Sequence, residues 1–370
     1  MRNRELKIMA LPGDLSACAY YRVFAPLAAM ERQGLAEVHR PPVRYKPNGR
    51  PDVKIRGQDL RGFDVAVFQR QSEAHIGALM EIARKLGVKT AFDLDDDMFS
   101  VTPASPAYMT FGRDYRKLAA RVPPEAQQRL VGGVRVEDPQ ATARRRVEKA
   151  QEMRQDAKGR VRGLLDNLRA ADLVTVSTPR LAEVYGAYRD DVVVLSNQVE
   201  PADWEAARAN PLPKPEGEVW IGWAGSKTHW SDLELVKRPL AQVLRRNPAA
   251  RLVLVGFPEA KDLFWKADEQ VYAFEWMDIE QYRHVVAAFD VALAPSAPST
   301  FNEAKSDIRV LEAALCGVPV VASETTYGAT VRAAGCGYVA KNAGKWLTYV
   351  NRLVSDPDLR AEMGAAGREY

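Results

Sequence analysis

Short apolar runs alternate along the chain with longer stretches in which apolar residues recur every three or four positions. The short runs are rich in Val, Ile and Leu, which is typical of buried parallel strands, and the longer stretches are typical of amphipathic helices. The runs that predict strands lie at residues 6–11, 63–69, 88–94, 172–177, 192–196, 220–223, 251–256, 271–274, 290–294 and 318–322. This alternation predicts an α/β protein with parallel, doubly wound sheets.

The clearest interruption of the pattern lies at residues 199–217, where four prolines stand among charged residues. Such a composition is typical of a linker between domains. We therefore expect two Rossmann-like domains, residues 1–198 and 218–370, and a basic helical insert at about 113–169 within the first.

The composition is that of an ordinary globular protein, with 370 residues of which 46% are hydrophobic and 27% charged. No apolar run approaches the roughly eighteen residues of a membrane-spanning helix, and the first residues are too charged for a signal peptide. We expect a cytoplasmic protein. Cys18, Cys316 and Cys336 are odd in number and form no C-x-x-C pair, which predicts core thiols rather than disulfides or zinc ligands.

Positive charge is concentrated in one region. The net charge is +4, yet residues 113–169 hold fifteen Lys or Arg against eight Asp or Glu. After Pro139 the spacing predicts a long helix with a cationic outer face. A solvated face is the ordinary interpretation. An anionic acceptor or peripheral contact with the inner face of a membrane is the alternative.

Polar side chains follow two predicted strands in the first half of the chain. The strand at 88–94 ends in a run of aspartates whose D-x-D spacing would suit a divalent cation, although helix capping or a polar rim for an acceptor are alternatives. We expect no metal. The loop after the strand at 6–11 lies at the same edge of the predicted sheet, where ligands bind. The candidates for binding a ligand at this edge, such as the acceptor of a transferred group, are Gly13, Tyr20, Arg22, Asp95 and Asp96.

In the second half, a glycine loop follows the strand at 220–223. It reads Gly225-Ser226-Lys227-Thr228-His229 and runs into a predicted helix. Backbone amides at a helix N-terminus, together with the ammonium of Lys227, suit a phosphate. We expect His229 to donate a hydrogen bond to a phosphate or a sugar. The alternative is a histidine packed against Trp230 and bonded to the backbone.

Residues 302–322 predict a loop, a helix and a buried strand. Ser306 is the expected N-cap and Gly317 the expected helix stop. Lys305 at the helix N-terminus suits a phosphate, whereas the carboxylate of Glu312 suits sugar hydroxyls. An ordinary helix and strand with a solvated Lys305 and Glu312 is the alternative. Asn302 precedes this helix and completes the motif.

With these motifs in view, the whole chain resembles the two-domain GT-B glycosyltransferases of the group-1 type, best in residues 171–204 and 218–322. The resemblance implies transfer of a sugar from a nucleotide-diphosphate sugar, with retention and without a metal, in a cleft between two Rossmann-like domains. The C-terminal domain would hold the donor and the N-terminal domain the acceptor. By position, Gly225, Ser226 and Lys227 resemble the diphosphate loop, Trp276 and Met277 the base contact, and Glu312 the ribose ligand.

The sequence departs from that family at two points. The E-x7-E signature would place an acid at Ala304, whereas the nearest acid is Glu303. The chain has N-x-x-K-S instead, from Asn302 to Ser306, which resembles a subgroup that also carries G-S-x-T-H-x-x-D, here residues 225–232. The family's Arg/Lys pair is likewise not in its usual form, and we infer that Lys227 and Lys305 compensate.

The expected mechanism centres on departure of the nucleoside diphosphate. Lys227, His229 and Lys305 would stabilise the developing charge or hold the sugar. The acceptor would lose its proton to the departing phosphate or to a carboxylate of the first domain such as Asp95 or Asp96. No permanently bound cofactor is expected, because the nucleotide sugar is a co-substrate. The acceptor would be a saccharide or lipid-linked intermediate of polysaccharide biosynthesis. A modified DNA base is an alternative acceptor, and a nucleotide-sugar epimerase or a non-catalytic nucleotide-sugar-binding protein are alternative functions. The donor base, the choice of hexose or pentose and the oligomeric state stay open.

Overall fold

A computed structural model describes residues 4–42, 44–45, 51–52, 55–101 and 158–370. Of the basic insert predicted at about 113–169, only residues from 158 onward lie in this part, and they are helical. The chain divides into two compact units. Unit 1 is drawn from Met1–Asp14, Glu31–Thr175 and Ala182–Val193, and unit 2 from Leu15–Met30, Val176–Leu181 and Val194–Tyr370.

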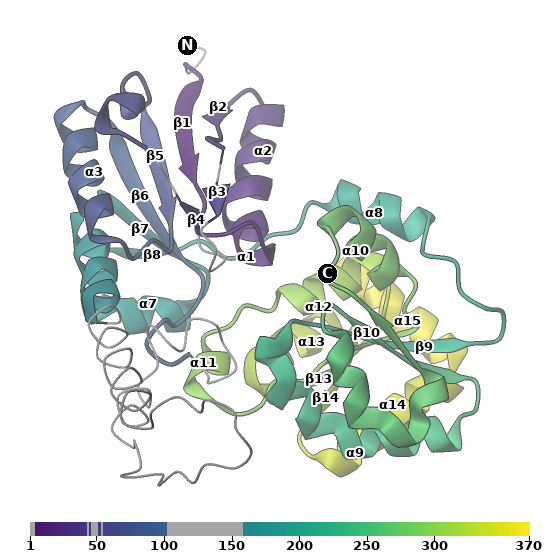
Figure 1. Ribbon diagram of the computed structural model, residues 1–370. Coiled ribbons are helices and arrows are strands. Elements are labelled where there is room, and N and C mark those ends of the chain that lie inside the picture. The colour runs from purple at the N-terminus through teal and green to yellow at the C-terminus, as the bar shows by residue number, and fades with distance from the viewer. Residues whose placement is uncertain (1–3, 43, 46–50, 53–54, 102–157) are drawn as a thin grey trace, which may run out of the picture. The chain divides into compact units, whose positions relative to one another are not determined.

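The first sheet has six strands in the order β2-β1-β5-β6-β7-β8, and β1 pairs in parallel with β2 and β5 (Figure 1). Its strands are β1 (Leu6–Leu11), β2 (Ala36–His39), β5 (Val65–Gln69), β6 (Lys89–Leu94), β7 (Leu173–Val176) and β8 (Val192–Val194). A two-stranded ribbon is made of β3 (Arg44–Tyr45) and β4 (Pro51–Asp52). The helices of this half are α1 (Ala17–Ala19), η1 (Tyr20–Phe24), α2 (Ala25–Arg32), η2 (Gly57–Leu60), α3 (Ala74–Lys85) and α7 (Pro179–Gly186).

The second sheet also has six strands, all parallel, in the order β11-β10-β9-β12-β13-β14. They are β9 (Val219–Ala224), β10 (Ala250–Val255), β11 (Val271–Phe274), β12 (Val291–Ala294), β13 (Val320–Ser323) and β14 (Gly337–Ala340). The helices are α8 (Pro201–Ala209), η3 (Lys227–His229), α9 (Trp230–Arg246), η4 (Pro258–Gln270), α10 (Ile279–Ala287), α11 (Thr300–Glu303), α12 (Ile308–Cys316), α13 (Glu324–Ala334), α14 (Ala343–Ser355) and α15 (Pro357–Glu369). The strand order reverses between β9 and β12, as in a doubly wound fold.

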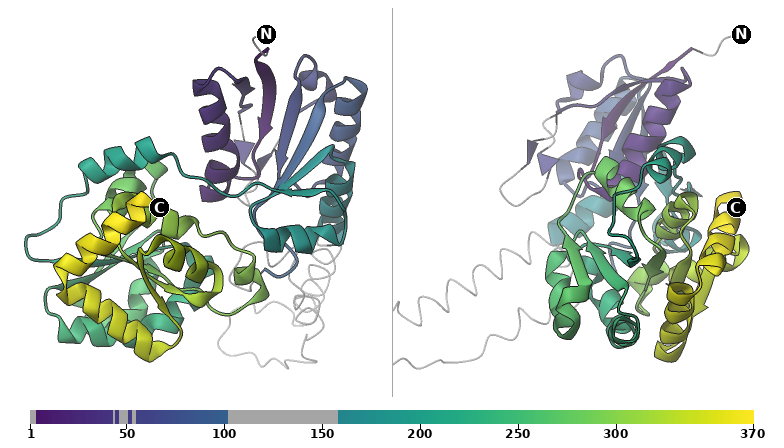
Figure 2. Two further views of the ribbon diagram at one scale, coloured as in Figure 1. Left: turned by 180° about the vertical axis from the view of Figure 1, so that it is seen from behind. Right: turned by 90° about the vertical axis from the view of Figure 1, so that its right-hand side faces the viewer.

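Alternating strand residues feed two cores, one on each face of this second sheet. Ile221 and Trp223 pack with α9, η4 and α14, whereas Trp220 packs with α8, α10 and α12. Helices lie on both faces of the sheet (Figure 2). Gly222 lies between Ile221 and Trp223 in β9, and a Cβ at that position would come within 2.3 Å of the ring of Phe289. The predicted α/β architecture with parallel sheets is therefore confirmed in detail.

Several elements differ from the sequence predictions. Within the predicted linker, α8 begins at Pro201 and buries Trp204, which is 1% exposed. Residues 17–32 form three successive helical segments, α1, η1 and α2, instead of one regular α-helix. Among the described residues, no helix is both long and apolar enough to cross a membrane.

Candidate functional site

The candidate site of unit 2 lies at the carboxyl edge of the second sheet. The loop that begins at Gly225 follows β9, and the segment that contains Asn302 and Lys305 follows β12. Because the strand order reverses between these two neighbouring strands, their loops flank the topological switch point, where open α/β sheets bind ligands. The structure thus brings together two motifs that are far apart in the sequence.

A histidine and an aspartate form the centre of this edge. Nδ1 of His229 lies 2.8 Å from Oδ2 of Asp232, and the two side chains are only 16% and 4% exposed. The other carboxylate oxygen of Asp232 accepts hydrogen bonds from the backbone N–H of Ala297 and from Nδ2 of Asn302, both at 2.8 Å. Asp232 therefore joins the loop after β9 to the loop after β12.

These contacts assign the protons of the dyad. The lowered pKa of Asp232 keeps it a carboxylate, so Nδ1 of His229 carries the proton between the two side chains. Burial, reinforced by the charge of Arg309, lowers the pKa of His229 to about 4, and the ring is neutral at pH 7. Burial opposes ionisation of Asp232, but its hydrogen bond from His229 lowers the pKa of that carboxyl. Nε2 of His229 is then an acceptor, which favours a sugar hydroxyl over a phosphate oxygen as its partner.

Asn302 is held as firmly as Asp232. Its Nδ2 also donates to the carbonyl of Ala297 at 2.8 Å, and its own carbonyl accepts from Oγ1 of Thr326 at 2.5 Å. Thr326 has a φ of 74°, a left-handed conformation that costs free energy for a β-branched residue. Such strain recurs at functional sites, where the surroundings over-determine the backbone.

Lys305 and Ser306 lie directly before α12. Nζ of Lys305 lies 4.4 Å from the centre of the Phe301 ring, and Oγ of Ser306 accepts from Nδ2 of Asn197 at 2.8 Å. The N-cap of α12 is Asp307 and not Ser306, so that part of the prediction was wrong, because the chain enters the helix one residue later. Gly317 ends the helix with a φ of 71°, as predicted. Glu303 is exposed at the end of α11.

Glu312, the predicted ribose ligand, is 4% exposed. Its two carboxylate oxygens accept hydrogen bonds from the hydroxyls of Tyr21 and Tyr282, the second at 2.7 Å. All three residues belong to unit 2. Burial raises the pKa of Glu312, and the two tyrosines and the nearby Arg309 partly offset that rise. A ribose would have to compete with these hydroxyls.

The glycine loop itself is more open. Lys227 is exposed, and the hydroxyls of Ser226 and Thr228 lie 2.7 Å apart. Beside the loop, a Cβ on Gly256 would lie 3.2 Å from the carbonyl oxygen of Gly225 and 3.3 Å from Cε3 of Trp276. The Trp276 ring is 57% exposed, so one face is available for stacking. Met277, its neighbour, packs against the core of unit 2.

Arg309, which the sequence analysis did not single out, is a further residue of this edge. It is the second residue of α12, and its charge acts on His229, Asp232 and Glu312 alike. A signal was available, because the positive end of a helix dipole disfavours a cation in the first turn. An arginine at that position therefore suggests an anionic partner.

Residues predicted for the acceptor side fall in both units. In unit 1, Arg70 forms ion pairs with Asp95 at 3.6 Å and with Asp96 at 3.3 Å, and it also pairs with Asp14. The backbone N–H of Gly13 donates to Oε1 of Gln69 at 3.0 Å. Arg70 has a φ of 51°, so this cluster also includes a strained backbone position.

Tyr20 and Arg22 belong to unit 2, on the π-helical segment η1. Nη2 of Arg283 donates to the hydroxyl of Tyr20, and Nη1 of Arg22 donates to Oδ1 of Asn197 at 2.9 Å. Arg22 is 6% exposed. Its guanidinium thus serves contacts within the unit, and Tyr20 keeps its hydroxyl bonded to Arg283.

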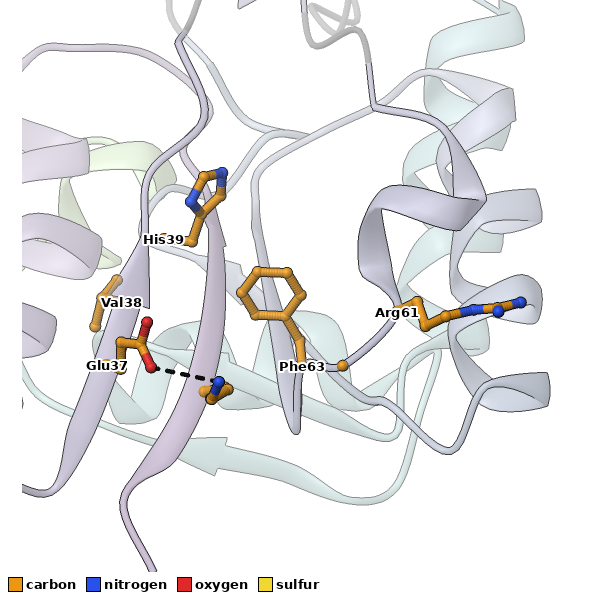
Figure 3. A pocket seen from close by; sticks show the side chains of 7 residues that line it. Glu37, Val38, His39, Arg61 and Phe63 are labelled. Atoms are coloured by element: carbon orange, nitrogen blue, oxygen red, sulfur yellow. Dashed lines mark ion pairs between the residues drawn. The ribbon is translucent and has the colours of Figure 1, made fainter.

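Unit 1 also has a surface depression that lies away from the predicted site residues. Lys7 and Glu37 form an ion pair of 3.6 Å at its edge, and the rings of His39 and Phe63 lie 5.8 Å apart (Figure 3). It adjoins the first residues of β1 and the residues just before β5, whereas the predicted residues follow the carboxyl ends of strands. None of the predicted site residues lines it.

Comparison with protein families places a known domain over the candidate site. Residues 218–356 match the family described as glycosyl transferases group 1. The matched segment includes both loops at the switch point and all of α12. Among curated protein sequences, none matches the chain.

Solved structures resemble the whole chain. HepE (Alr3699) of Anabaena in complex with UDP has a TM-score of 0.53 at 14% identity, covering 99% of this chain and 94% of that one. WaaG, a glycosyltransferase involved in lipopolysaccharide biosynthesis, has a TM-score of 0.54 at 14% identity, covering 99% and 95%. A putative UDP-N-acetylglucosamine 2-epimerase from Listeria monocytogenes has a TM-score of 0.51 at 12% identity, covering 98% and 91%. With the two parallel sheets, these likenesses show the two-domain α/β fold called GT-B.

Proposed function

We propose that the protein transfers a sugar from a nucleoside diphosphate sugar to an acceptor hydroxyl, and that unit 2 binds the donor. The observation that carries this proposal is the joining of the loops after β9 and β12 by Asp232, which bonds to His229, Ala297 and Asn302. The match of residues 218–356 to group 1 glycosyl transferases supports it. So do the solved relatives that bind UDP or are named as glycosyltransferases.

In this proposal the exposed Trp276 stacks on the base, and Lys227 and Lys305 contact the diphosphate. The ammonium groups and the N-terminus of α12 stabilise the charge that develops as the nucleoside diphosphate departs. Nε2 of His229 accepts a hydrogen bond from a hydroxyl of the transferred sugar, because its other nitrogen donates to Asp232. This arrangement orients the sugar without a covalent enzyme intermediate.

The remaining features of the proposal come from the family resemblance. The reaction proceeds with retention, needs no metal and uses no permanently bound cofactor. Asp96 in unit 1 takes the proton of the acceptor hydroxyl, and Gly13 and Asp95 line the acceptor side. The acceptor is a saccharide or a lipid-linked intermediate of polysaccharide biosynthesis, made on the cytoplasmic side of a membrane. The cluster of Asp14, Asp95 and Asp96 around Arg70 disfavours a polyanion such as DNA there.

A thermal-shift screen of nucleoside diphosphates and nucleotide sugars tests the donor site. A ligand at 100 times its dissociation constant should add about 2.7 kcal/mol to the stability of the folded state. The nucleotide sugar that stabilises the protein is then incubated without an acceptor. Slow release of the nucleoside diphosphate supports a transferase. Isomerisation of the intact nucleotide sugar would show an epimerase, like the putative Listeria enzyme of similar fold. Binding without any turnover would show a binding protein.

A further inference from the structure

Two buried N–H groups below the loop after β9 have no hydrogen-bond partner. They are Nη1 of Arg309 and Nε1 of Trp223. Trp223 is fully buried, and Arg309 is partly buried with no exposed surface at Nη1. A buried donor without an acceptor is unfavourable, because it has lost its hydrogen bonds to water. Two such donors close together suggest that an acceptor binds there.

Both side chains meet at Gly225. A Cβ on Gly225 would lie 2.8 Å from Cζ2 of Trp223 and 3.2 Å from Nη2 of Arg309. Cζ2 is bonded to the ring carbon that carries Nε1, so the indole N–H is close to the same backbone position. A side chain at position 225 would therefore collide with the indole of Trp223 and crowd Nη2 of Arg309. The donors therefore lie at the loop that the sequence pattern already indicated as a phosphate site.

Among the described residues, Arg309 makes no direct contact with a carboxylate, although the charges of Asp232 and Glu312 act on it and help to raise its pKa. Within the part of the chain that the structure describes, its guanidinium forms neither an ion pair nor a hydrogen bond. The nearby carboxylates have other partners, since Asp232 bonds to His229 and Asn302, and Glu312 bonds to two tyrosines. The N-terminus of α12 adds a further partial positive charge. An anion at this loop would supply the direct acceptor that Nη1 of Arg309 lacks.

We propose that Arg309 and Trp223 bind phosphoryl oxygens of the donor diphosphate from below the Gly225 loop. The assignment rests on the proposed function. It adds Arg309 as the main cation that neutralises the negative charge of the diphosphate. A guanidinium offers two parallel N–H groups to one phosphoryl group, and Lys305 from the neighbouring loop adds a second cation. A guanidinium and an ammonium from neighbouring loops suit a diphosphate better than a ligand with a single charge.

The test compares Arg309→Met with the wild type and with Arg238→Gln, which removes an exposed arginine from α9 of the same unit. Melting temperatures are measured without ligand, with inorganic pyrophosphate, and with UDP, GDP, ADP, CDP and dTDP in turn. Nη1 of Arg309 has no partner among the described residues of the ligand-free protein, so Arg309→Met should leave the ligand-free melting temperature unchanged or raise it. The nucleoside diphosphate that stabilises the wild type should bind Arg309→Met about 10- to 100-fold more weakly.

Arg309→Lys keeps the charge but loses the paired N–H groups, so we expect intermediate affinity. Trp223→Phe, which removes only the indole N–H, should weaken binding about 2- to 10-fold. Arg238→Gln should bind as the wild type does. The assignment is overturned if Arg309→Met binds the nucleoside diphosphate as tightly as the wild type, or if it melts several degrees lower without ligand. Failure of the proposed function looks different, because then no nucleoside diphosphate stabilises even the wild type.

Discussion

The neutral state of His229 makes the stability of the protein depend on pH. The pKa of this side chain falls from 6.5 in the unfolded chain to about 4 in the folded protein, where the side chain is 16% exposed. Between these values the unfolded chain binds a proton that the folded protein does not. The free energy of unfolding therefore decreases as the pH falls from 6.5 towards 4, and above pH 6.5 the contribution is fully present.

The size of the effect follows from the shift. At about 1.4 kcal/mol per pKa unit, His229 destabilises the folded protein by roughly 2 kcal/mol at pH 5 and roughly 3 kcal/mol at pH 4. Glu312 acts in the opposite direction, because burial raises its pKa and its protonated form is favoured in the folded protein. A single pH profile would mix the two contributions, so a variant is needed.

His229→Asn isolates the effect. The amide nitrogen of asparagine occupies the place of Nδ1, so it still donates to Asp232, but it does not titrate. Urea unfolding of both proteins from pH 7.5 to pH 5 should show the wild type losing about 2 kcal/mol relative to His229→Asn. A difference between the two proteins that is independent of pH would refute a neutral, buried His229. The same variant lacks Nε2 and should turn over the donor more slowly.

Three further substitutions test the site and the core. Lys305→Ala should lower kcat at least about 100-fold, since it removes charge stabilisation of the leaving group, and near-normal turnover in folded protein would reject that role. Trp276→Ala should weaken nucleotide binding about 5- to 100-fold by calorimetry and leave the ligand-free melting temperature unchanged, because the ring is 57% exposed. Gly222→Ala should cost about 1–3 kcal/mol in urea unfolding, because its Cβ would meet the Phe289 ring within 2.3 Å. Gly186→Ala is the control, since its Cβ would meet no heavy atom within 4 Å.

Local structure was predictable wherever one residue pattern dominates. β1 and β11 have the bounds that the apolar runs predict, although the first two residues of β1 are exposed and β11 is a partly buried edge strand. Helix α8 was not predicted, since its prolines and charges are typical of a linker. What holds it is Trp204, which packs against α10 and α12 of the same unit. That packing depends on the tertiary structure, which the local sequence does not reveal.

The site was predictable as two motifs but not as one network. The spacing of His229 and Asp232 is visible in the sequence, because residues three apart share a helix face. Asn302 bonds to Asp232 across seventy positions, and only the order of the strands brings them together. Of the two tyrosines that bond to Glu312, Tyr21 lies 291 positions away in the sequence and Tyr282 lies 30 positions away. Chemistry that depends on strand order needs the fold before it can be assigned.

A negatively charged ligand at this site should change the pKa of His229, which is paired with Asp232. Burial is the largest cause of the lowered pKa of His229, and the charges of Arg309 and Lys305 add to it. An anion that neutralises these cations removes their share of the effect, so it must raise the pKa of His229. By linkage, protonation of His229 then strengthens anion binding by the same factor. In the proposed reaction the leaving diphosphate gains negative charge, so the same coupling would favour protonation of His229 as that charge develops. His229 would therefore begin the reaction as an acceptor for a sugar hydroxyl, and its pKa would be higher at the end of the reaction.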